Sequence, residues 1–170
     1  MIEKDIMARY IASIVDIELE EFTLTALLQA PDSYWEIPAS TTSKHHPPQS
    51  NGEGGLVRHV LAGLYFIKEF CTAYSATQDE CDCCIAAMVL HDVGKAIGHP
   101  HDVVWASVLS PTNELTKTAI NAVRFHMGKW STDIGNKTFP EDFSRIEQIV
   151  HLADYAASRK RIRLSSLDYH

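Results

Sequence analysis

The sequence has no apolar run of the length that is needed to span a bilayer. Its first residues, Met1 to Asp5, lack the basic and apolar regions of a secretory signal peptide. Cysteine is scarce too, because the 170 residues include only four, and three of these fall in one turn at Cys81, Cys83 and Cys84. That spacing is no disulfide framework for a secreted chain. We therefore expect a soluble cytoplasmic protein with no membrane partner.

The chain also has little positive charge. Its formal net charge is -7, which disfavours broad, sequence-independent binding of duplex nucleic acid, because such binding depends on Lys and Arg neutralising phosphates. One basic cluster stands out near the C-terminal end of the chain, formed by Arg159, Lys160, Arg161 and Arg163. The composition therefore leaves room for a local anion site but not for a large basic surface.

No segment shows the alternation of apolar and polar residues that is typical of a strand, and we find no internal repeat. Apolar residues instead recur at helical spacing in several segments. In the second of these, Ile17, Leu24 and Leu28 fall on one face. Residues 35–55 form a long loop rich in Pro and Gly, which is unusual inside a compact domain and often functional. We predict one all-α helical bundle over 1–170, with N-terminal helices in 1–30. The predicted helices are 4–15, 17–29, 56–74, 78–92, 101–110, 114–127 and 139–163.

The dipeptide His91-Asp92 is the most informative feature. It ends the apolar run 85–90 and is followed by Val93-Gly94-Lys95. An ionised carboxylate in apolar surroundings is costly unless it is paired or bound to a metal. Asp154 lies in a similar apolar stretch and has the same need. The chain supplies further candidate ligands at a distance, namely His59, His101 and His126.

Each of these residues has a plainer interpretation, because a single histidine on a helix is more often a surface or core residue than a ligand. Together, His59, His91, Asp92 and Asp154 offer two nitrogens and two carboxylates. That mixture suits a divalent ion such as Mn²⁺, Fe²⁺, Co²⁺, Ni²⁺ or Zn²⁺. The set contains no thiolate, which argues against a structural zinc site.

The arrangement His59, His91-Asp92 and Asp154 resembles the H…HD…D pattern of the HD-domain superfamily of metal-dependent phosphohydrolases, and Gly94-Lys95 fits its H-D-x-G-K form. Further segments resemble the HD domains of certain 3′→5′ exoribonucleases and relaxase-linked proteins. These segments are Pro38-Ala39-Ser40, His45-His46, Gly54-Gly55-Leu56-Val57-Arg58-His59, His101 with Trp105-Ala106-Ser107, His126-Met127-Gly128, and His151 with Asp154. The resemblance implies a single HD-domain bundle with its core at 37–163.

Two departures from these relatives matter. Met127 stands where many relatives with two metals have a second histidine, which leaves a second ion with Asp92 as a bridge and with His101 and His126. The RNA-degrading relatives also carry an OB-fold, and this chain has no room for one. Its absence weakens an exonuclease interpretation, because such domains hold single strands by stacking and by basic grooves.

The resemblance implies that the metal activates a water, which Asp92 orients toward a phosphoester. Lys95 is placed to neutralise phosphate charge, or else it is a solvated residue favoured by the helix dipole. His101 and His126 are candidates for a second metal, for contact with the substrate, or for protonating the leaving group.

Helical geometry sorts the basic cluster. Seven steps from Asp154 to Arg161 turn about 700° and return close to the same face, and Ser158 lies near it at about 400°. Arg159 points about 140° away. Arg161 and Ser158 are thus candidate substrate-binding residues, against the alternative of a solvated basic turn. Trp105 and Trp130 could stack on a nucleobase, although packing is the commoner fate of tryptophan.

We therefore predict a metal-dependent phosphohydrolase that acts on a small phosphoester, with a nucleotide as the favoured substrate. The alternatives are a 3′→5′ exonuclease or phosphodiesterase on single-stranded nucleic acid, and a non-catalytic regulatory module stabilised by metal. The sequence does not indicate the oligomeric state.

Overall fold

The structure is a computed structural model that describes residues 2–42, 44–131 and 137–161. Within these ranges the chain forms only helices and no strand, which confirms the all-α prediction. None of the described helices combines the length and the apolar character that crossing a bilayer requires. The α-helices are α1 (Ile2–Ile11), α2 (Ile17–Leu28), α3 (Gly55–Ala73), α4 (Gln78–Leu90), α5 (His101–Val108), α6 (Glu114–Phe125) and α7 (Arg145–Ala157).

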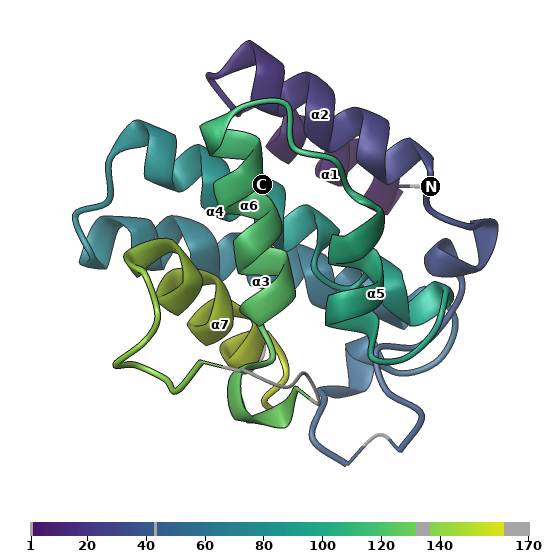
Figure 1. The fold of residues 1–170 in the computed structure, drawn as a ribbon. Helices are drawn as coiled ribbons and strands as arrows, with labels where there is room; N and C mark the ends of the chain where they lie inside the picture. Colours follow the sequence, from purple (N-terminus) through teal and green to yellow (C-terminus); the bar gives the residue numbers. More distant parts are fainter. Residues whose placement is uncertain (1, 43, 132–136, 162–170) are drawn as a thin grey trace.

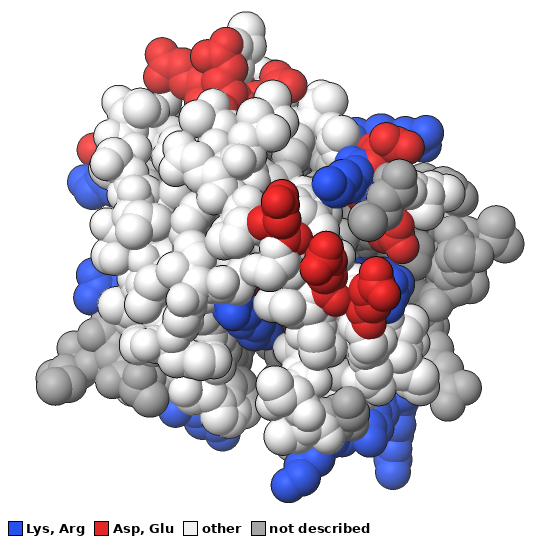
Figure 2. All heavy atoms as spheres, turned by 90° about the vertical axis from the view of Figure 1, so that its right-hand side faces the viewer, with Lys and Arg blue, Asp and Glu red and all other residues white. Residues whose placement is uncertain are grey.

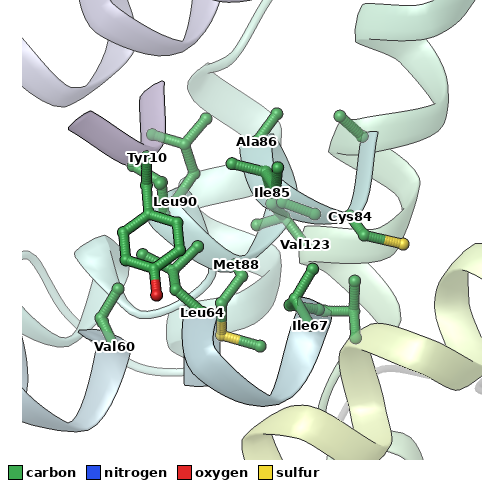
Figure 3. Close-up of a cluster of buried hydrophobic side chains, with 14 of the residues drawn as sticks. Tyr10, Val60, Leu64, Ile67, Cys84, Ile85, Ala86, Met88, Leu90 and Val123 are labelled. Carbon is green, nitrogen blue, oxygen red and sulfur yellow. The ribbon is translucent and has the colours of Figure 1, made fainter. Parts of the chain in front are cut away.

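Helix α4 is the centre of the bundle. Its second half is apolar on every side, as expected for a helix that is surrounded by others, and it packs against α1, α2, α3, α6 and α7. Figure 1 shows α1 and α2 together at the top of the molecule, α5 at the right and α7 at the lower left. Figure 3 shows the core between them, where side chains of α1, α3 and α6 surround Met88 and Leu90. The N-terminal helices therefore belong to the same core as the rest.

The prediction of a final helix over 139–163 was wrong at both ends. Helix α7 begins after Ser144, whose Oγ accepts from the backbone N–H of Glu147, while the Glu147 carboxylate accepts from that of Ser144. This reciprocal capping box satisfies two backbone donors at the helix start. The helix ends at Ala157, and Ser158 forms its C-terminal cap.

The apolar face expected for the second helix was also misassigned. Ile17, Leu24 and Leu28 are exposed, and Leu28 keeps 77% of its surface accessible. The face that packs on α4 carries Leu19 and Leu27 instead. Because α2 has apolar residues on both faces, periodicity alone could not identify the inward one.

The cysteines in the turn that begins α4 behave as small apolar residues. Cys83 and Cys84 are fully buried in the core, and Cys71 of α3 is buried beside them. Among the described residues no cysteine belongs to a group that could hold a metal ion. The hydrophobic interpretation of these residues is the one the structure supports.

Between Glu36 and Gly54, the described residues of the long loop are irregular apart from the 3₁₀ turn η2 (Pro48–Ser50). Backbone hydrogen bonds from Ala39 to Ser50 and from Gly54 to Glu36 hold the loop together, and one from Leu56 to Ile37 joins it to the start of α3. Gly55 cannot carry a side chain there, because a Cβ would overlap the Ser50 carbonyl oxygen. This close contact fixes the first turn of α3 and therefore the position of His59.

Candidate metal centre

The four residues of the H…HD…D pattern converge at one point in the fold. His59 lies in the second turn of α3, His91 caps the end of α4, Asp92 follows it, and Asp154 lies near the end of α7. The Nε2 atom of His59 is 2.9 Å from Asp154 Oδ1 and 3.6 Å from Asp92 Oδ2. His91 Nε2 is 3.3 Å from Asp92 Oδ2 and 3.7 Å from Asp154 Oδ1. These distances follow from the packing of α3 against both α4 and α7.

The other oxygen of Asp92 faces a second pair of histidines. His101, the first residue of α5, places Nε2 3.2 Å from Asp92 Oδ1. His126, the cap of α6, places Nε2 3.8 Å from the same oxygen. We call the group of His59, His91 and Asp154 with Asp92 Oδ2 the Oδ2 side, and the group of His101 and His126 with Asp92 Oδ1 the Oδ1 side. Asp92 is therefore shared by both.

Two of the histidines are oriented by the helix that each one ends. His91 Nδ1 donates to the Met88 carbonyl at 2.7 Å, and His126 Nδ1 donates to the Val123 carbonyl at 2.6 Å. With the proton held at Nδ1, the lone pair lies on Nε2, which is the form that binds a metal. The same helix-end geometry thus aims both Nε2 atoms at Asp92.

Several polar atoms of this centre are buried without a hydrogen-bond partner among the described residues. They include Nε2 of His91, His101 and His126, and Oδ1 of Asp92. Buried polar atoms are rarely left unpaired, because desolvation without a partner costs about 1–3 kcal/mol each. Imidazole nitrogens and carboxylate oxygens that converge on one point are the ligands of a transition-metal ion. The residues therefore fit a bound divalent cation.

The charges of the Oδ2 side lead to the same conclusion. Burial opposes ionisation of Asp92, but His91 and Lys95 outweigh it and hold its pKa well below the usual range. Asp154 is likewise held ionised, because its contacts with His59 and His91 outweigh burial and keep its pKa low. Burial lowers the pKa of His91, yet Asp92 and Asp154 outweigh it and raise this pKa to about 10. The buried carboxylate of Asp92 and the partly exposed one of Asp154 thus create a demand for positive charge at this point.

The Oδ1 side is different in charge. Burial, reinforced by nearby His91, lowers the pKa of His126 to about 3. His126 is therefore neutral at physiological pH, which suits a ligand. A neutral imidazole with its Nδ1 proton held by a carbonyl favours the ligand role, and the role in protonating a leaving group stays a prediction.

Lys95 lies in the 3₁₀ turn η3 (Val93–Ala96), which directly follows Asp92. Its ammonium donates to Asp92 Oδ2 at 2.6 Å and to the Ala39 carbonyl of the long loop at 3.4 Å. Its side chain is 21% exposed, close to the 20% of Asp154, while that of Asp92 is buried. Lys95 and Asp154 therefore mark the side on which solvent reaches the centre.

Gly94 explains why the motif has a glycine after the ligand pair. A Cβ at this position would overlap the backbone carbonyl of His101. The first turn of α5 can approach η3 only because that side chain is missing, and this approach brings His101 to Asp92.

Two residues near the metal centre were not among the site residues that the sequence predicted. His46, in the long loop, lies edge-on to His59 with ring centroids 5.2 Å apart, and burial followed by repulsion from His59 lowers its pKa to about 4. Tyr34, in η1 (Asp32–Trp35), is fully buried with an unpartnered hydroxyl, and burial together with Asp92 raises its pKa. The adjacent histidines 45 and 46 were the signal for the first, but nothing in the pattern indicated which of them turns inward.

The two predicted substrate residues beyond Asp154 lie outside this constellation. Because α7 ends at Ala157, the helical argument that placed Arg161 on the Asp154 face is wrong, and Arg161 is exposed. Ser158 donates its hydroxyl hydrogen to the Tyr155 carbonyl and accepts from Arg159. Its hydroxyl is thus engaged within the end of α7.

An all-α bundle whose core holds converging histidines and aspartates defines a metal-binding helical domain. The HD domain family matches residues 56–158, which is more than half of the chain, and the chain belongs to that family. HD domains bind divalent metals and are typically metal-dependent hydrolases. The match contains every candidate ligand described above, whereas Tyr34 and His46 precede it.

No curated protein and no solved structure matches the chain. The finer resemblance to exoribonucleases and relaxase-linked proteins therefore stays a prediction, as does the extension of the core to 37–163.

Proposed function

We propose that the chain is a metal-dependent phosphohydrolase that acts on a small phosphoester, with a nucleotide as the favoured substrate. The observation that carries the proposal is the sharing of one buried carboxylate, Asp92, between the Oδ2 and Oδ1 sides. A structural ion needs only one closed set of ligands. A bridging carboxylate with ligands on both sides is the arrangement of a hydrolytic centre.

The residues of the Oδ2 side would hold the principal cation, and His101 and His126 would hold a second one with Asp92 between them. A divalent cation here supplies Lewis-acid polarisation of a phosphoryl oxygen and acidifies a water. The hydrolysis would form a bond from the water oxygen to phosphorus and break the bond from phosphorus to the leaving oxygen, which takes up a proton.

The chain's own residues divide the remaining tasks. The substrate would approach at the exposed edge, where Lys95 offers positive charge to the phosphate. Asp92, which is buried and ionised, would orient the attacking water. His126 stays neutral, which suits the ligand role that it would share with His101.

The test is phosphate release from a panel of nucleotides and ring-free phosphoesters by protein loaded with Mn²⁺ or Co²⁺. Asp92→Asn removes the shared charge with almost no change in shape. Asp79→Asn is a matched control, because it makes the same change at an exposed position in the first turn of α4. We expect release by the wild type and the control and none by Asp92→Asn. Equal rates for all three proteins would overturn the proposal.

The same assay separates the two alternatives. A labelled single-stranded oligonucleotide that is cut while mononucleotides stay intact would favour a nuclease. The face shown in Figure 2 gives no support to that outcome, because its described Lys and Arg residues form small separate groups and no continuous basic stripe. Metal binding with a raised melting temperature but no turnover of any substrate would favour a regulatory module.

A further inference from the structure

A second feature of α7 lies next to the metal centre. A cavity of about 570 Å³ opens between α7 and the segments on either side of residues 132–136. Its volume lies within the range of small-molecule sites. Its described lining residues are Lys129, Trp130, Ser131, Lys137, Thr138, Phe139, His151, Leu152 and Tyr155.

The wall of this cavity is a stack of aromatic rings. The indole of Trp130 lies nearly parallel to the rings of His151 and Tyr155, at interplanar angles of 17° and 15° and centroid distances of 5.8 and 6.1 Å. These two residues are four apart on α7 and so lie on one face of that helix. Trp130 thus has one ring face against α7, yet 51% of its surface is exposed, and Tyr155 is 41% exposed. Large aromatic surfaces left open beside a cavity are typical of a place where a ligand ring stacks.

The charge around the stack is positive. The Lys129 ammonium is 5.1 Å from the Trp130 ring centroid, and the Arg159 guanidinium is 4.1 Å from that of Tyr155. Lys137, also in the wall, is paired with Glu147. None of the described lining residues is acidic, although the chain as a whole is strongly acidic. The surroundings therefore favour an aromatic ligand that carries negative charge.

The cavity is joined to the metal centre through His151. Its Nδ1 donates to the backbone carbonyl of His126 at 2.6 Å, and Gly128, with φ of 53°, leaves room for its ring. His126 is itself a residue of the Oδ1 side. On α7, Asp154 lies between His151 and Tyr155, so a residue of the Oδ2 side is within about one helical turn, 5.4 Å of rise, of the aromatic wall.

We infer that this cavity binds the nucleobase of the substrate, so that the phosphoester cleaved at the metal centre is that of a free nucleotide. The inference rests on the proposed function and names its substrate class. A ring stacked on the face of Trp130 that does not lie against α7 would extend the aromatic stack, and its phosphate would extend toward Lys95 and Asp92.

The first experiment measures binding without turnover. Adenosine and adenosine monophosphate are titrated into the protein in the presence of a chelator, and the tryptophan fluorescence is followed. We expect quenching by both ligands that is lost in Trp130→Phe, because that variant removes the reporting indole while it keeps a ring. By calorimetry, Trp130→Ala is expected to bind roughly 5- to 100-fold more weakly, the range observed for loss of a stacked aromatic.

The second experiment measures specificity. The ratio of kcat/KM for adenosine monophosphate to that for glycerol phosphate, which has no ring, is compared across variants. Trp130→Ala and Tyr155→Ala should each lower this ratio, while Leu28→Ala, a change at an exposed apolar residue of α2, should preserve it. Circular dichroism verifies that each variant is folded, and Tyr155→Phe should restore the ratio.

The two proposals fail in different ways. Hydrolysis with an unchanged ratio in both alanine variants would overturn the base-binding role and leave the hydrolase standing. Ring binding that depends on Trp130 without hydrolysis of any phosphoester would overturn the hydrolase and leave the cavity as a site for an aromatic ring. Quenching by single-stranded oligonucleotides but not by adenosine monophosphate would overturn the assignment to a free nucleotide.

Discussion

The two oxygens of Asp92 face surroundings of opposite character. Oδ2 lies 2.6 Å from the Lys95 ammonium, 3.3 Å from His91 and 3.6 Å from His59. Both histidines also contact the ionised carboxylate of Asp154. Oδ1 meets the imidazoles of His101 and His126, and among the described residues no second carboxylate or ammonium is paired with it. The two oxygens of one carboxylate thus face different sets of charged groups.

The difference follows from where the second carboxylate lies. Because Asp154 comes from α7 on the Oδ2 side, two negative charges meet there, and they raise the pKa of His91 to about 10 against the effect of its burial. On the Oδ1 side burial dominates, and the pKa of His126 falls to about 3. A divalent cation gains more from two carboxylates than from one, so we expect the tighter metal binding on the Oδ2 side.

The largest expected effect is that of Asp92→Asn, which removes the charge common to both sides. We expect metal binding on both sides to fail and phosphate release to fall by more than about 100-fold, the upper end of what loss of an outer-shell partner costs. Metal content after gel filtration and initial rates measure the two losses. If Asp92→Asn still bound metal on one side, metal binding on the two sides would not depend on one shared carboxylate.

Asp154→Asn and His126→Gln test the two sides separately. The first should weaken the tighter binding and the second only the weaker, because each removes a ligand from one side. Ligand linkage at 100 times Kd is worth about 2.7 kcal/mol, so Mn²⁺ should raise the melting temperature of the wild type by about 5–10 °C. We expect most of this rise to disappear in Asp154→Asn and most of it to remain in His126→Gln. The reverse order would show that the Oδ1 side binds more tightly.

Gly94→Ala reaches the Oδ1 side through the backbone. The new methyl group would overlap the His101 carbonyl, so the start of α5 must shift and take the imidazole away from Asp92. Such overpacking costs about 1–3 kcal/mol, which urea unfolding measures.

The control for this variant is Gly98→Ala in the same connection, because a Cβ there meets nothing within 4 Å. We expect Gly94→Ala to retain metal on the Oδ2 side and Gly98→Ala to retain it on both. Loss of all metal in Gly94→Ala would mean that α5 supports both sides.

The residues of this centre that lie on helices or at their ends could be predicted from the sequence. His91-Asp92 was identifiable because a carboxylate at the end of an apolar run needs a partner, and the structure gives it several. Asp154 was identifiable for the same reason. A charged residue inside a regularly apolar stretch can be recognised from the sequence, because burying its charge is costly without a partner.

Residues of the centre that lie outside regular apolar stretches could not be predicted in this way. His46 and Tyr34 lie in irregular segments, where their inward direction depends on contacts distant in the sequence. Of the two tryptophans considered for stacking, Trp105 is buried and Trp130 exposed, and periodicity could not separate them. The error in α7 was avoidable, since Ser144 and Glu147 form a capping box that the sequence displays openly.

The smallest effect concerns the proton that His91 carries when no metal is bound. Its pKa in the folded protein, about 10, is above the value of about 6.5 for an unfolded histidine. The stabilisation from this proton is therefore complete below pH 6.5 and is lost as the pH rises toward 10. In a chelator, the free energy of unfolding of the wild type should fall between pH 7 and 9 by no more than about 1.4 kcal/mol per pH unit relative to His91→Gln.

Because both proteins share every other titrating group, the difference between their urea-unfolding curves isolates this proton. Excess metal should abolish the difference in slope, since a cation on the Oδ2 side supplies the positive charge that the proton otherwise provides. Parallel curves for the two proteins in chelator would show that His91 binds no extra proton. Lys95 alone would then offset the negative charge of Asp92 and Asp154. The contrast in charge between the two sides of Asp92 would be smaller than the structure implies.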